Sequence, residues 1–85
     1  MIWLTTTFYL GLHMADIDWN KLATNTIKAE LARSGIGYEE LINRLDTMGI
    51  KESYTGIAAK INRGTFSFAF FMQCMNVLGK TEIHL

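Results

Sequence analysis

The chain has 85 residues, enough for one domain with a modest hydrophobic core, and its apolar fraction of 49% argues against disorder. Eight lysines and arginines balance eight aspartates and glutamates, so the composition excludes a generic polycation. A single cysteine, no proline and two distant histidines, His13 and His84, exclude an internal disulfide, proline-rich ligand segments and a zinc site built from neighbouring cysteines and histidines.

The first fifteen residues carry no Asp, Glu, Lys or Arg. Ile2 to Tyr9 is rich in β-branched and aromatic side chains, which favours a strand over a helix. The run is shorter than the roughly 18 apolar residues of a membrane-spanning helix, and it lacks the positive region and cleavage site of a secretory signal. Met14 opens a sequence typical of a natural start. We therefore expect residues 1–13 to be a mis-assigned start or an appendage, or else a strand or a partly ordered tail.

The first helical pattern begins after Asp16 or Asp18, either of which can cap a helix by accepting a hydrogen bond from a free main-chain amide. Apolar side chains recur every four residues and predict one buried stripe, formed by Trp19, Ala23, Ile27 and Leu31. The polar residues expected on the opposite side are Lys21, Thr24, Asn25 and Lys28. Ser34 and Gly35 end the helix, and Gly35 is a natural left-handed residue after it.

A second helix is predicted over residues 38–47. Glu39 and Glu40 stand in its first turn, where the helix dipole favours anions. Its predicted buried face consists of Leu41, Ile42, Leu45 and Met48. Gly49 ends this helix, and a short link leads to Ser53.

A third helix is predicted over residues 54–62, with Ser53 as its N-cap and Gly64 after its end. Ile57 and Ile61 are its expected core contacts. The helical period then directs Glu52, Thr55, Gly56, Ala59, Asn62 and Arg63 outward, with Ser53, Tyr54 and Lys60 at the margins. A glycine inside a helix costs about 1 kcal/mol relative to alanine, and the sequence gives no reason for Gly56 except a close approach to the backbone.

A fourth helix starts near Ser67, and its apolar face consists of Phe70, Phe71, Cys74, Met75 and Leu78. Phe66 precedes the cap and is expected to pack as a staple against Phe70 or Phe71. Phe68 lies off this face, so we expect it to be exposed or to meet a partner. Gly79 ends the helix. Residues 81–85 alternate polar and apolar side chains and predict a short strand, which pairs with Ile2–Tyr9 or with a second chain.

The predicted fold is therefore all-α, with four to five short helices in a helix-turn-helix domain over residues 14–80. Gly35 to Leu41 at the first turn and Ile61 to Gly64 at the end of the third helix resemble the repressor-like helix-turn-helix class of small bacterial and phage regulators, over about residues 22–79. The block from Lys60 to Cys74 is similar to the hallmark of a small bacterial family catalogued as a domain of unknown function. That family has no established role and supplies no functional residues.

The resemblance to the repressor-like class implies a cytoplasmic transcription regulator whose third helix enters the major groove of double-stranded DNA. The candidate DNA-binding residues are Tyr38, Ser53, Tyr54, Thr55, Ala59, Lys60, Asn62 and Arg63. Two departures stand out. Tyr38 occupies a position where the class often has a phosphate-binding glutamine, and Gly56 and Ala59 leave few side chains long enough to reach bases. Residues 20–65 hold seven basic and five acidic side chains, so a monomer has few phosphate contacts, and we expect a homodimer.

The alternative is a non-catalytic protein-interaction or dimerisation module on the same scaffold, which zero net charge and the uncharged first segment suit. Arg63 fits either a phosphate contact or a helix end that favours cations. Tyr38 fits either a donor to phosphate or a packed ring. Cys74 is expected in the core, away from any base. We expect no enzyme activity, cofactor, metal site, membrane contact or small-molecule substrate.

Overall fold

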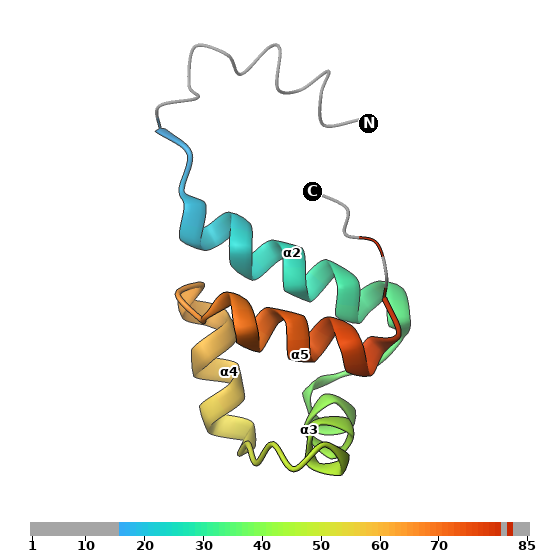
Figure 1. Ribbon diagram of the computed structural model, residues 1–85. Helices are drawn as coiled ribbons and strands as arrows, with labels where there is room; N and C mark the ends of the chain where they lie inside the picture. Colours follow the sequence, from blue (N-terminus) through green and yellow to red (C-terminus); the bar gives the residue numbers. More distant parts are fainter. Residues whose placement is uncertain (1–15, 81, 83–85) are drawn as a thin grey trace.

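The computed structural model describes residues 16–80 and 82. These residues form four helices, α2 (Trp19–Ser34), α3 (Tyr38–Thr47), α4 (Tyr54–Arg63) and α5 (Phe68–Leu78) (Figure 1). The all-α prediction is confirmed, and the described part of the chain contains no strand. The predicted N-terminal segment 1–13 lies outside the described residues. So does the predicted strand 81–85, except for Glu82, which has no regular secondary structure.

Side-chain caps set where three of the helices begin. Asp18, one of the two predicted candidates, accepts a hydrogen bond from the Lys21 amide over 3.0 Å and caps α2. Ser53 accepts from the Gly56 amide at the start of α4, and Ser67 accepts from the Phe70 amide at the start of α5, each over 3.0 Å. Gly35, Gly64 and Gly79 follow α2, α4 and α5, as predicted.

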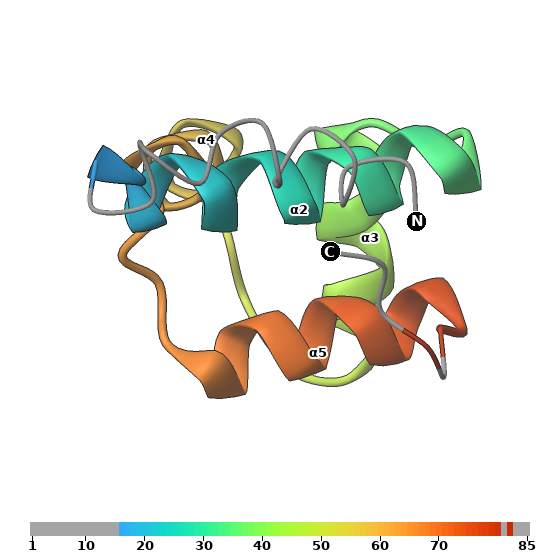
Figure 2. The ribbon, with the colours of Figure 1, turned by 90° about the horizontal axis from the view of Figure 1, so that it is seen from above.

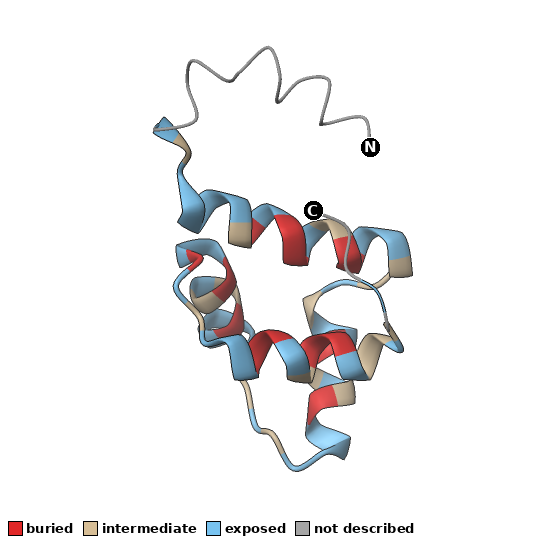
Figure 3. Ribbon diagram, turned by 45° about the horizontal axis from the view of Figure 1, so that its top comes forward, coloured by how far each residue is buried: buried red, intermediate tan, exposed pale blue. Residues whose placement is uncertain are grey.

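The four helices enclose one core. Helices α2 and α5 lie side by side and begin at the same end of the molecule (Figures 1 and 2). Helix α4 packs on α2 and α3, and α3 packs on α4 and α5. Buried residues face inward on every helix (Figure 3). The core consists of Ile27, Leu31, Leu41, Leu45, Ile57, Ile61, Phe70, Phe71, Cys74 and Met75.

Two residues predicted in buried stripes are exposed. Trp19 is 65% exposed. On a helix of 3.6 residues per turn, residues four apart differ by about 40° in direction, so side chains spaced strictly by four gradually turn away from the core. Thr24, predicted on the polar side, is instead buried. Met48 is 42% exposed because it is the C-cap of α3, beyond the last helical residue. The residues that α2 buries are Thr24, Thr26, Ile27, Glu30 and Leu31.

The start of α5 agrees with the sequence. The ring of Phe66 lies 5.7 Å from that of Phe70 and 6.4 Å from that of Phe71, measured between centroids, which confirms the staple. Phe68 is 71% exposed, and Cys74 is fully buried. Within the segments that the structure describes, no helix combines the length and the apolar character needed to cross a membrane.

Candidate nucleic-acid interface

Helix α4 separates its side chains as the sequence predicts. Ile57 and Ile61 are fully buried, 0% exposed. The residues on the opposite side, Thr55, Ala59, Asn62 and Arg63, are all exposed. Among the residues predicted to face outward, Glu52 is the exception, because its side chain is only 12% exposed. Helix α4 therefore presents a stripe of small and polar side chains between its two ends.

The C-terminal end of α4 is fixed against the first turns of α2. Gly64 follows α4 with a φ of +69°, and a Cβ atom there would lie 1.9 Å from the carbonyl oxygen of Asn20. The Thr24 hydroxyl donates a hydrogen bond to the carbonyl oxygen of Ile61 over 2.6 Å. Only glycine combines this left-handed backbone with such a close approach. These contacts hold Asn62 and Arg63 beside the polar side chains of α2.

An open pocket of about 480 Å³ lies at this junction. Its lining comes from the start of α2 and the end of α4, and consists of Asp18, Asn20, Lys21, Thr24, Asn25, Lys28, Asn62 and Arg63. Three of these side chains are cationic, and Asp18 is the one carboxylate. Asp18 is already used as the cap of α2, through its 3.0 Å contact with the Lys21 amide. The side chains that line this pocket therefore carry a net positive charge.

The distribution of ion pairs distinguishes these three cations from the other five. The paired cations are Arg33 with Glu30 at 2.9 Å, Arg44 with Glu40 at 3.0 Å, Lys51 with Asp46, Lys60 with Glu52 at 2.7 Å and Lys80 with Glu30 at 3.7 Å. Lys21, Lys28 and Arg63 make no ion pair with any acid of residues 16–80 or with Glu82. All three line the same pocket.

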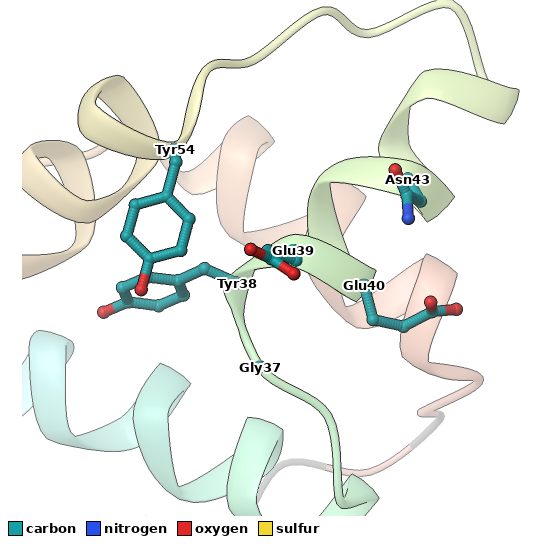
Figure 4. A pocket seen from close by; sticks show the side chains of 6 residues that line it. All are labelled: Gly37, Tyr38, Glu39, Glu40, Asn43 and Tyr54. Carbon is teal, nitrogen blue, oxygen red and sulfur yellow. The ribbon is translucent and has the colours of Figure 1, made fainter.

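The other end of α4 carries an aromatic pair. The rings of Tyr38 on α3 and Tyr54 on α4 meet edge to face, with centroids 5.6 Å apart and planes at 67° (Figure 4). Burial, and to a lesser degree the neighbouring Tyr54, raises the pKa of Tyr38, so its hydroxyl stays protonated at neutral pH. The pocket beside the pair, about 440 Å³, is also lined by Glu39 and Glu40. These carboxylates disfavour an anion here, and the Tyr38 ring packs against Tyr54 and the core.

Two predicted site residues have their polar groups already engaged. The Lys60 ammonium lies 2.7 Å from the Glu52 carboxylate and 4.6 Å from the centroid of the Phe70 ring. The Ser53 hydroxyl accepts from the Gly56 amide, and a Cβ at Gly56 would come within 2.8 Å of that oxygen. The glycine inside α4 therefore leaves room for the cap of its own helix. Ser53 therefore caps α4, and Lys60 pairs with Glu52 within the domain.

The structure brings the predicted site residues into two groups at the ends of α4, with Thr55 and Ala59 between them. Sequence reasoning missed Lys21, Asn25 and Lys28, which join Asn62 and Arg63 in the junction pocket. A signal for them was present, because positions 21, 25 and 28 follow the spacing i, i+4, i+7 and so share one face of a helix. From the sequence, this face was expected only to be polar and exposed to solvent.

Four helices around one core, with an exposed polar face on α4, define a small all-α domain. A family model described as "Domain of unknown function (DUF6471)" matches residues 19–83, so the chain belongs to that family. The match begins at the first residue of α2 and takes in all four helices. No curated protein and no solved structure matches the chain.

Proposed function

We propose that the domain is a non-catalytic transcription regulator that binds double-stranded DNA, with α3 and α4 as a helix-turn-helix pair and α4 in the major groove. One observation carries this proposal. Helix α4 buries Ile57 and Ile61 completely and leaves Thr55, Ala59, Asn62 and Arg63 exposed on one stripe. A helix can enter a groove only if the scaffold grips one side and leaves the other side uncovered.

The dimensions and chemistry of this stripe suit a groove. An α-helix with its side chains is about 10–12 Å across, and the major groove of B-DNA is about 12 Å wide. Ala59 lets the helix backbone approach closely, and the methyl group of Thr55 fits a thymine methyl. The Asn62 amide matches the donor and acceptor edge of adenine, while Arg63 matches guanine or a phosphate.

The proposed active form is a homodimer in the cytoplasm. One copy of α4 offers only a few side chains to the bases, and the chain has no net charge. Because phosphate contacts supply most of the affinity of such proteins, one domain alone binds weakly. Two copies double the contacts and match the two-fold symmetry of an operator.

Selection from a pool of randomised duplexes tests the proposal without knowledge of the operator. We expect rounds of binding at 50 mM salt to enrich a short preferred sequence. Asn62→Ala should relax the preference at one base position, at a cost of about 1–3 kcal/mol in binding, because it removes a base contact. The matched control is Asn76→Ala, at an exposed position on α5. Absence of binding to any duplex at 50 mM salt, or equal effects of the two variants, contradicts the proposal.

A second candidate, a protein-interaction module on the same scaffold, is favoured by exposed apolar side chains. Trp19 at the start of α2 and Phe68 at the start of α5 are 65% and 71% exposed, and both helices start at the same end of the molecule (Figures 1 and 2). Met72, one turn further along α5, is 49% exposed. Large exposed apolar groups are typical of interaction sites. This candidate predicts self-association that Trp19→Ser with Phe68→Ser abolishes, and sedimentation of a strict monomer at high concentration contradicts it.

A further inference from the structure

The junction pocket indicates a second role for the first helix. We propose that Lys21, Asn25 and Lys28 of α2, together with Arg63 of α4, form a phosphate-binding surface that holds the DNA backbone beside the groove occupied by α4. This inference rests on the proposed function and extends it, because it assigns sequence-independent affinity to α2 and Arg63, and base recognition to the other exposed residues of α4. We call these four residues the phosphate surface.

Charge distinguishes the phosphate surface from the rest of the described domain. Of the eight lysines and arginines, the three without an ion pair among the described residues are the three on the phosphate surface. Pairing with a carboxylate weakens a cation as a partner for phosphate, so the other five have less to offer. An unpaired, solvent-exposed cation releases a bound counterion from DNA when it neutralises a phosphate. The free positive charge of the described domain is therefore concentrated at one place.

The spacing of Lys21, Asn25 and Lys28 along α2 suits the spacing of DNA phosphates. Residues 21, 25 and 28 share one helix face, and all three are exposed. Lys21 and Lys28 are seven residues apart, which corresponds to about 10 Å along the helix axis. One DNA strand carries a phosphate every 3.4 Å or so of its axis, so two long lysine side chains at this separation can reach different phosphates of one strand. The Asn25 amide lies between them and supplies a neutral donor.

The phosphate surface is also continuous with α4. The junction pocket joins Lys21 and Lys28 to the C-terminal end of α4 through Asn62 and Arg63. A second open pocket, of about 350 Å³, is lined by Lys28 and Ala32 of α2 and by Tyr54 at the other end of α4. The exposed face of α2 thus borders α4 from Arg63 to Tyr54. When α4 lies in a groove, this face of α2 therefore lies next to the backbone of the duplex.

Asp18 provides an independent test of the same surface. Its carboxylate lines the junction pocket and caps α2. Asparagine caps a helix as well as aspartate does, so Asp18→Asn removes the negative charge and keeps the cap. If phosphates bind here, this variant binds DNA more tightly than the wild-type protein. If they do not, its affinity is unchanged.

The main experiment is a titration of a fluorescently labelled 20-base-pair duplex, followed by anisotropy between 50 and 200 mM KCl. We expect Lys21→Gln and Lys28→Gln each to weaken binding and to make the slope of log K against log salt shallower by about 0.9, the value for one lost phosphate contact. Lys51→Gln removes the same charge from a lysine that is paired with Asp46, and we expect it to leave the slope unchanged. Circular dichroism of each variant checks that the fold is retained.

The outcomes separate this inference from the function on which it rests. No binding by the wild-type protein at 50 mM KCl overturns both. Binding by the wild type with slopes that Lys21→Gln and Lys28→Gln do not alter overturns the phosphate surface and leaves α4 as the DNA-binding element. Equal slope changes for Lys28→Gln and Lys51→Gln also overturn it, because the effect then reflects net charge alone. Tighter binding by Asp18→Asn together with shallower slopes for both lysine variants supports it.

Discussion

Thr24 of α2 donates a hydrogen bond from its hydroxyl group to the main-chain carbonyl oxygen of Ile61 in α4, over 2.6 Å. Thr24 is 8% exposed and Ile61 is fully buried, so the bond is shielded from water. Ile61 lies in the last turn of α4, and its carbonyl oxygen also accepts a hydrogen bond from the Gly64 amide over 3.2 Å. One side chain thus helps to cap α4 and also sets its position on α2. The placement of Arg63 beside Lys21 depends on this contact.

Replacement of Thr24 by valine tests how much this contact stabilises the fold. Thr24→Val keeps the shape of the side chain and removes the donor, so we expect a loss of about 1–2 kcal/mol in the free energy of unfolding. Thr26→Val is the matched control, because the Thr26 hydroxyl donates to Leu22 within its own helix, over 2.8 Å. Urea unfolding of both variants gives the comparison. Equal losses in the two variants would mean that the hydrogen bond between α2 and α4 stabilises the fold no more than the one within α2.

Alanine at Gly64 should be far more disruptive than alanine at another helix-ending glycine. Both Gly64 and Gly79 have a left-handed backbone, with φ of +69° and +72°. A Cβ at Gly64 would meet the Asn20 carbonyl oxygen at 1.9 Å, whereas a Cβ at Gly79 would meet nothing within 4 Å. We expect Gly79→Ala to cost about 1 kcal/mol and Gly64→Ala about 3 kcal/mol or more. Thermal unfolding of the two variants measures the difference, and similar melting temperatures contradict the close packing of α4 on α2.

The sequence predicts the helices well because each one begins and ends with local signals. Ser53 and Ser67 cap α4 and α5 through their own chain neighbours, and no tertiary contact is needed to anticipate them. The burial of Thr24 was not predictable in this way. A threonine among lysines and asparagines suits a solvated face, and only the docking of α4 supplies the carbonyl that it binds. Contacts between segments distant in the sequence, such as that of Thr24 with Ile61, could therefore not be predicted from local patterns.

Lys60 and Glu52 should behave as one stabilising unit. The Glu52 side chain is 12% exposed and its carboxylate lies 2.7 Å from the Lys60 ammonium. Lys60→Met strands this carboxylate in a partly buried site. We expect a loss of about 1 kcal/mol, less than a fully buried pair would lose, because solvent still reaches a third of Lys60. The double variant Lys60→Met with Glu52→Gln should recover most of it. Chemical denaturation of the four proteins in the cycle tests this, and additive losses contradict the coupling.

Cys74 should not react with thiol reagents while the protein is folded. Burial raises the pKa of the Cys74 thiol to about 12, so very little thiolate forms at neutral pH. We expect labelling by a thiol reagent only at the rate at which the protein opens. In the unfolded chain the thiol ionises above about pH 9, whereas in the folded protein it stays protonated to higher pH. The thiol therefore makes its full contribution to the free energy of unfolding below pH 9, and this contribution is lost as the pH rises toward 12.

Cys74→Ala isolates this effect from the other groups that titrate in alkali. The gap in stability between the wild-type protein and Cys74→Ala should narrow as the pH rises above 9, because only the wild type loses the contribution of the thiol. Urea unfolding at pH 8, 9, 10 and 11 measures the gap. A gap that stays constant over this range, or rapid labelling at pH 7, contradicts the burial of the thiol.

The candidate site was predictable in part. Ile57 and Ile61 as inward residues, and Thr55, Ala59, Asn62 and Arg63 as outward residues, follow from helical periodicity alone. The partners of the charged side chains do not follow from it. Lys60 was predicted at the margin of the DNA-binding face, and helical periodicity did not indicate that its ammonium pairs with Glu52, eight residues earlier. Lys21 and Lys28 were regarded as ordinary surface residues, and their convergence with Arg63 becomes visible only when α4 is placed on α2.

The most direct test of DNA binding through α4 is an NMR titration of the ¹⁵N-labelled protein with the selected duplex. We expect the largest amide shifts on Thr55, Ala59, Asn62 and Arg63, with a second set on Lys21 and Lys28. The exposed positions Met72 and Asn76 on α5 should not move. Shifts confined to Trp19, Phe68 and Met72, or a spectrum that the duplex leaves unchanged at 50 mM salt, would contradict it.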